Sequence, residues 1–149
     1  MRSLGAFFVK ILFLVTLFSC TSNKLKSDCI KCNISMAVRF INEDIVNEQM
    51  ADSLFCTGTD SCLRNVEFME VFNEALFVGL NKNPEMFIKL FSNSSKKEFI
   101  LKQLERPIND TIELKKIIDK LTNITKGDSE SRNKILQALN LALKNLIGN

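Results

Sequence analysis

The sequence contains no histidine, no tryptophan and no tyrosine, whereas phenylalanine occurs 12 times among its 149 residues. Histidine is the commonest general base in enzymes and the commonest zinc ligand. Its absence excludes every Ser-His and Cys-His nucleophile. Carboxylates and lysines remain available for acid–base chemistry, but no pair of them stands out. We therefore predict that the protein is not an enzyme and that it holds no cofactor or metal.

The chain also lacks a strong charge of one sign. It has 20 basic and 17 acidic residues, and two of the basic ones, Arg2 and Lys10, precede Cys20. From Cys20 onward 18 basic residues face 17 acidic residues, which gives a net charge of +1. A nearly neutral chain offers no electrostatic case for binding nucleic acid, and we predict no such partner.

No apolar run is long enough to span a bilayer. Residues 11–18 read ILFLVTLF, whereas a spanning helix needs about 20 apolar residues. Extending the run back to Leu4 places Lys10 inside it, which disfavours a permanent transmembrane anchor. A basic start, a short apolar core and the small Ser19 before Cys20 are typical of a secretory signal peptide.

Residues Leu17-Phe18-Ser19-Cys20 resemble a lipobox, the motif that bacterial lipoprotein-processing enzymes recognise. Leu17, Ser19 and Cys20 match the motif, and Phe18 is larger than the usual residue, as in the relaxed lipoboxes of spirochaetes. The resemblance implies that the Cys20 thiol receives a diacylglyceryl group and that the chain is cut before it. Several acyl chains hold a protein stably at a membrane, whereas one acyl chain anchors only marginally. Cys20 is the predicted lipidation site.

Asparagine, lysine, isoleucine and leucine are abundant, which indicates translation from an AT-rich genome. With the signal peptide and the loose lipobox, this composition resembles the small plasmid-encoded surface lipoproteins of Borrelia-type spirochaetes, with the orf-D type as the suggested subgroup. The resemblance implies a protein anchored by lipid in the cell envelope, at the outer membrane or cell surface, that binds a host or envelope protein.

A secreted eukaryotic helical cytokine-like ligand is the alternative, because it would also combine a signal peptide, four cysteines and a helical bundle. No residue motif assigns the chain to a cytokine family. Chance is a sufficient explanation for its Asn-x-Ser/Thr sequons, given the abundance of asparagine. These sequons begin at Asn33, Asn93, Asn109 and Asn123.

Four cysteines remain when Cys20 is set aside: Cys29, Cys32, Cys56 and Cys62. An even number in an exported chain indicates disulfides. Of the three connectivities, we favour the local pairs Cys29–Cys32 and Cys56–Cys62. If residues 33–55 form one helix, its ends lie about 33 Å apart, and bridges between the two pairs are impossible. A break near Asn42 would restore them.

The Cys29-x-x-Cys32 spacing also permits two functional interpretations. A thioredoxin-like redox motif begins a helix in a βαβ setting, and no strand pattern surrounds this pair. A four-cysteine zinc site usually has shorter spacing than the five residues between Cys56 and Cys62. Structural disulfides are the favoured interpretation.

Apolar residues recur at helical spacing through the chain, and no segment shows sustained strand alternation. We predict an all-α bundle of about five or six helices with a disulfide-reinforced N-terminal hairpin. Residues 1–19 would be the signal peptide, 20–28 a lipidated tether and 29–149 one helical domain. Expected features include a second helix capped by Ser61 with Leu63 and Val66 on its buried side, a capping box at Ser95, a helix from Asn109 or Asp110, and a last helix ending near Ile147.

Two stretches are candidate binding surfaces. The phenylalanine-rich segment 66–91 would either pack in the core from two sides or expose a groove for a partner helix or lipid. The amphipathic segment 133–149 would either pack in the core or contact a membrane surface, although its few basic residues argue against the membrane. Core packing is the favoured interpretation of both.

Overall fold

The computed structural model describes residues 29–109 and 111–147. In these residues the chain forms seven α-helices and one short 3₁₀ helix, without strands, which confirms the predicted all-α class. The elements, in chain order, are α1 (Ile34–Asn42), α2 (Glu48–Thr57), η1 (Asp60–Cys62), α3 (Val66–Lys82), α4 (Pro84–Asn93), α5 (Lys97–Leu104), α6 (Leu114–Thr122) and α7 (Ser129–Ile147).

Asparagine side chains begin the first four α-helices. In each case the side-chain oxygen accepts a hydrogen bond from the backbone N–H three residues later, at 2.9–3.2 Å. This bond satisfies one of the N–H groups that a helix start leaves without a partner. Several of the abundant asparagines therefore have a structural role, and the capping residues are Asn33, Asn47, Asn65 and Asn83.

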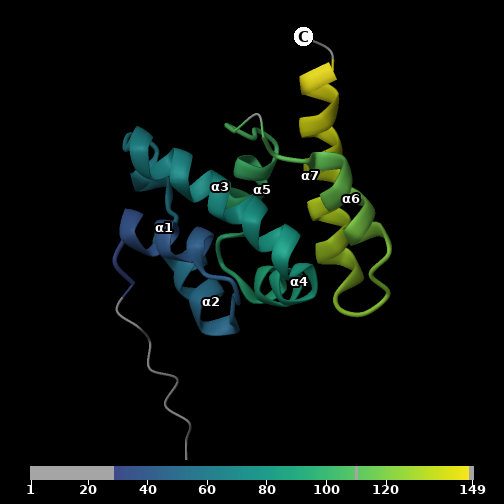
Figure 1. Ribbon diagram of the computed structural model, residues 1–149, viewed down its shortest axis with the longest axis horizontal. Helices are drawn as coiled ribbons and strands as arrows, with labels where there is room; N and C mark the ends of the chain where they lie inside the picture. Colours follow the sequence, from purple (N-terminus) through teal and green to yellow (C-terminus); the bar gives the residue numbers. More distant parts are fainter. Residues whose placement is uncertain (1–28, 110, 148–149) are drawn as a thin grey trace, which may run out of the picture.

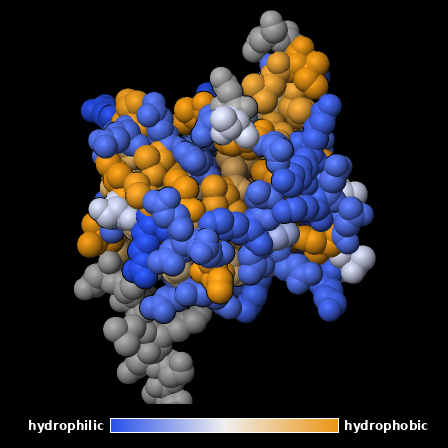
Figure 2. Space-filling model, in the orientation of Figure 1, coloured by the Kyte–Doolittle hydropathy of each residue, from blue (hydrophilic) through white to orange (hydrophobic). Residues whose placement is uncertain are grey.

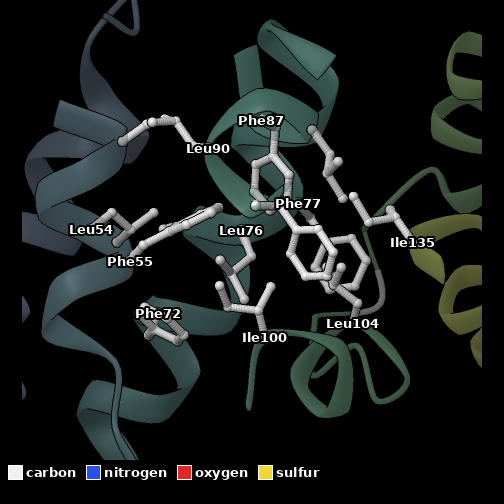
Figure 3. Packing of buried hydrophobic residues seen from close by; sticks show 14 of the residues in the cluster. Leu54, Phe55, Phe72, Leu76, Phe77, Phe87, Leu90, Ile100, Leu104 and Ile135 are labelled. Atoms are coloured by element: carbon white, nitrogen blue, oxygen red, sulfur yellow. The ribbon is translucent and has the colours of Figure 1, made fainter. Parts of the chain in front are cut away.

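The long helix α3 lies at the centre of the molecule and packs against α1, α4, α5 and α6 (Figure 1). Every phenylalanine from Phe40 onward is buried. Figure 3 shows side chains from α2, α3, α4, α5 and α7 pointing into one shared core. The rings of Phe55 and Phe87 meet edge-on at 4.9 Å between centroids, and that arrangement is favourable for aromatic pairs. One core thus connects both halves of the described chain.

The first helical section breaks after Asn42, so α1 and α2 are separate helices that pack together. Lys82 at the end of α3 donates to the carbonyl oxygens of Ile41 and Glu43 at 2.9 and 2.6 Å. These bonds satisfy carbonyl groups at the end of α1. Val46 is buried between the two helices, and Asn47 then caps α2. The structure therefore contains the break near Asn42 that the sequence left open as an alternative to one helix over residues 33–55.

Three expected helix starts differ from the structure. Ser61 lies in η1, and Asn65 caps the following helix instead. The Ser95 capping box does not form: α5 begins at Lys97 without a side-chain cap. The helix expected from Asn109 or Asp110 begins only at Leu114. Of these three helices only α3 has a side-chain cap, and α5 and α6 begin without one.

Pro84 occupies the first turn of α4, as expected. Its missing N–H and fixed φ both suit that position. The last helix ends at Ile147, as expected. By contrast, Leu63 and Val66 are 54% and 67% exposed, although the sequence placed both on a buried helix face. They lie before and at the start of α3, where the chain has not yet entered the core.

Gly58 follows α2, and any side chain there would enter the core. A Cβ atom built on Gly58 would lie 2.4 Å from Phe72 Cζ and 2.9 Å from Phe99 Cε1. Both rings are buried, so a side chain at residue 58 would have to displace core atoms.

We predict that Gly58→Ala lowers the free energy of unfolding by about 1–3 kcal/mol, the usual cost of overpacking a core. Urea unfolding followed by circular dichroism measures this loss. Ser92→Ala on the surface of α4 is the control, with an expected change below about 0.5 kcal/mol. Unchanged stability of Gly58→Ala would show that the rings move apart freely.

Candidate functional site

Two disulfides join the segment before α1 to the end of α2 and to η1. Cys29 pairs with Cys56, and Cys32 pairs with Cys62, with Cα–Cα distances of 5.7 and 5.5 Å. The Cys32 N–H also donates to the Thr57 carbonyl oxygen at 3.0 Å. Cys32 has a φ of +55°, so the backbone turns sharply between the two bridges. The expected reinforcement of the N-terminal hairpin is therefore present.

The favoured local pairing, Cys29–Cys32 and Cys56–Cys62, is wrong. Its premise was a single helix over residues 33–55, which would separate the two cysteine pairs by about 33 Å. Because the chain reverses between α1 and α2, the segment before α1 instead lies beside the end of α2. Each cysteine of the Cys-x-x-Cys pair then reaches a different partner.

This pairing also bears on the redox and zinc interpretations. In an oxidised thioredoxin-like motif the two cysteines would be bonded to each other. Here Cys29 and Cys32 are each bonded to a different cysteine. All four cysteines from Cys29 onward are in disulfides, so none presents the thiolate that binds zinc. Among the described residues, no group of three or more cysteines, aspartates and glutamates is placed to hold a metal ion.

Cys20 lies outside the described residues, as do the proposed signal peptide and tether. The sequon asparagines have local structural roles. Asn33 caps α1, and the side-chain amides of Asn93 and Asn123 donate to the backbone carbonyls of Lys89 and Asp119. The Asn109 side chain accepts hydrogen bonds from the backbone and hydroxyl of Thr111.

Most of the phenylalanine-rich segment 66–91 packs in the core. Phe68 and Phe77, which lie off the main apolar face of α3, are as buried as Phe72. In the last helix, Ile135 and Leu139 are buried, whereas Leu146 and Ile147 are 55% and 72% exposed. Figures 1 and 2 show that the end of α7 projects beyond the other helices with apolar atoms on its surface.

A buried asparagine on α3 fixes the chain that follows α5. Asn73 is fully buried, and its amide nitrogen donates to the carbonyl oxygens of Gln103 and Arg106 at 2.8 and 3.2 Å. Its side-chain oxygen accepts from the Ile108 N–H at 3.1 Å. One side chain thus bonds to three backbone groups, one in the last turn of α5 and two in the non-helical chain that follows it. No pattern in the sequence indicates this role, because an asparagine inside a helix pattern normally points to solvent.

The segment that Asn73 holds forms one wall of a surface hollow of about 570 Å³. We call it the α3–α5 hollow. Its apolar part comes from Leu63, Met69 and Ile108. Leu63 and Ile108 are 54% and 50% exposed, so the hollow is open to solvent. Its polar part comes from the C-terminal half of α5 and the residues after it, namely Lys102, Gln103, Glu105 and Arg106.

Smaller hollows lie elsewhere on the surface. One of about 180 Å³ between α3 and α6 includes Glu74 and Glu113. Two further hollows of about 330 and 390 Å³ share residues 94–96, and the first of them is also lined by Cys29 and Cys56. Neither these hollows nor the α3–α5 hollow contains a nucleophile hydrogen-bonded to a base.

The carboxylates and lysines with shifted pKa values lie in exposed pairs and a helix cap. A hydrogen bond from Lys116 lowers the pKa of Glu113, and hydrogen bonds from the Ser131 side chain and backbone lower that of Asp128. A hydrogen bond to Glu130 raises the pKa of Lys134. These groups stabilise their helices, either through ion pairs between residues three or four positions apart or by capping a helix start. None of them lines the α3–α5 hollow.

Among residues 29–109 and 111–147, none of the helices combines the length and the apolar content that a membrane-spanning helix requires. No protein-family model, curated protein or solved structure matches the chain.

We predict that non-reduced proteolytic digests contain linked peptides joining Cys29 to Cys56 and Cys32 to Cys62. Replacing either pair by serine should lower the free energy of unfolding by about 2–4 kcal/mol, because each bridge closes a loop of 27 or 30 residues. The Cys32→Ser/Cys62→Ser variant should lose more than Cys29→Ser/Cys56→Ser, since Cys62 is fully buried. Linked peptides joining Cys29 to Cys32 would contradict the structure.

For Asn73→Ala, we expect a loss of about 2–4 kcal/mol, because the Arg106 carbonyl and the Ile108 N–H lose their partner and the Gln103 carbonyl keeps only the Arg106 N–H. Denaturant unfolding measures this loss. Asn140→Ala is the matched control: the Asn140 amide bonds to one carbonyl on the exposed side of α7, and its removal should cost less than about 0.5 kcal/mol. Equal effects of the two substitutions would contradict the proposed role of Asn73.

Proposed function

We propose that this chain is a bacterial lipoprotein, cut before Cys20 and anchored through lipid on that residue, which binds a host or envelope protein at the cell surface. One observation carries the proposal. The chain has five cysteines, and Cys29, Cys32, Cys56 and Cys62 are all paired with each other. No cysteine of the same chain therefore remains for Cys20, which stands in the lipobox-like sequence after the short apolar run.

The position of the first described residues supports this anchor. Cys29 is bonded to Cys56 in α2, and Figure 1 shows α1 and α2 on the opposite side of the molecule from the end of α7. The chain from Cys20 to Cys29 reaches at most about 30 Å when extended. A lipid on Cys20 would hold the α1–α2 side towards the membrane, and the end of α7 would face away from it.

The domain that this anchor would carry suits a binding role. Histidine-dependent nucleophilic catalysis is excluded by the sequence. The structure has instead a core reinforced by two disulfides and an open apolar hollow rimmed by charged residues. A rigid domain on a short tether would present its surface to partners close to the membrane, within the tether's reach of about 30 Å.

We predict that wild-type protein made in a lipoprotein-processing bacterium begins at an acylated Cys20 and partitions with the membrane. Cys20→Ser should lose the acyl mass and leave the membrane fraction, because no lipid is attached. Ser22→Ala, two residues later, is the control and should remain acylated. Mass spectrometry of the mature N-terminus and membrane fractionation measure both properties.

An unmodified N-terminus at another position would contradict the lipoprotein proposal. Glycan on Asn93 or Asn123 of protein from its natural source would favour the secreted cytokine-like ligand instead.

A further inference from the structure

We propose that the α3–α5 hollow binds a single-chain anionic amphiphile, a free fatty acid, with its acyl chain on Leu63, Met69 and Ile108 and its carboxylate at Lys102 and Arg106. The inference goes beyond the proposed function, and it does not depend on lipidation of Cys20.

The apolar floor of the hollow comes from parts of the chain that are distant in sequence. Leu63 precedes α3, Met69 lies in its first turns, and Ile108 follows α5. Leu63 and Ile108 each expose half or more of their surface although neither lies at a chain end. The hollow of about 570 Å³ is within the range of small-ligand sites, roughly 300–1,000 Å³. Filling it with an acyl chain would remove these exposed side chains from water.

The rim supplies charge of the sign that a carboxylate needs. Lys102 lies in the last turn of α5 and Arg106 lies two residues after its end, and both residues line the hollow. Neither has a carboxylate partner within 4.0 Å among the described residues. Glu105 is the one acidic residue of the lining, which leaves a net charge of +1 there. An amphiphile with a negative head and one apolar tail complements this arrangement.

The wall that carries Arg106 and Ile108 is fixed before a ligand arrives. Asn73 bonds to the Arg106 carbonyl and to the Ile108 N–H from the buried side of α3. The hollow is therefore part of the folded structure, and binding would not require the chain to be ordered at that moment. Such preorganisation lowers the entropic cost of binding.

The test uses the chain from residue 20 with Cys20→Ser, which keeps every described residue and carries no acyl chain of its own. Calorimetric titration compares octanoate, decanoate and dodecanoate with decyltrimethylammonium, all below their micelle concentrations. We expect the affinity to rise by up to about fourfold for each methylene that becomes buried. Decanoate should bind more tightly than decyltrimethylammonium, which has the same tail and the opposite head charge. Amide NMR shifts should be confined to residues around 63–69 and 102–108.

Variants separate the head group from the tail. Lys102→Gln and Arg106→Gln should each weaken decanoate about two- to fivefold and leave decyltrimethylammonium unweakened, since both cations are exposed. Glu105→Gln should tighten decanoate by a similar factor. Leu63→Asp should abolish binding of both ligands. The matched controls are Lys144→Gln and Leu141→Asp on α7, which should bind like the parent chain; Leu141 is 44% exposed.

Three results would overturn the proposal: no saturable binding of any fatty acid, equal affinity for the two head groups, or shifts outside the hollow. Sedimentation analysis of the parent chain and Leu63→Asp tests the other occupant. If the parent is a dimer that Leu63→Asp dissociates, a second copy covers the hollow and the fatty-acid proposal is wrong.

Discussion

The reversal of the chain between α1 and α2 is the constraint on which the N-terminal half depends. It brings the segment before α1 against the end of α2, and only then can Cys29 reach Cys56 and Cys32 reach Cys62. The reversal is itself fixed from a distance, because Lys82 at the end of α3 accounts for carbonyl groups at the end of α1. The disulfides therefore stabilise an arrangement that packing and hydrogen bonds to α3 also specify.

The same central helix organises the other half of the molecule. α3 contributes Phe72, Leu76 and Phe77 to the core that α4, α5 and α7 complete (Figure 3). It also places Asn73 where a single amide holds the chain after α5. Because that chain is not helical, its backbone groups needed partners from elsewhere. The same chain after α5 is open towards solvent, so Ile108 is half exposed and contributes to the α3–α5 hollow.

The proposed activities fit this division of the structure. The disulfide-reinforced side contains the start of the described chain and would face the membrane if Cys20 carries lipid. The α3–α5 hollow lies on a segment that Asn73 fixes, so its shape does not depend on the anchor. The exposed salt bridges, such as Glu48–Lys89, contribute little to stability, and the core and disulfides carry most of it.

The sequence by itself determined the helical class, the start of α4 at Pro84 and the end of α7, because apolar periodicity and proline geometry are local properties. It also singled out Cys20 as the predicted lipid site. Only the tertiary structure decided the disulfide pairing, since that depends on a break between α1 and α2 that the local pattern left open. The tertiary structure likewise decided that Leu63 and Val66 remain exposed and that Asn73 is buried. Helical spacing shows which residues share a face, but the neighbouring elements determine whether that face is covered.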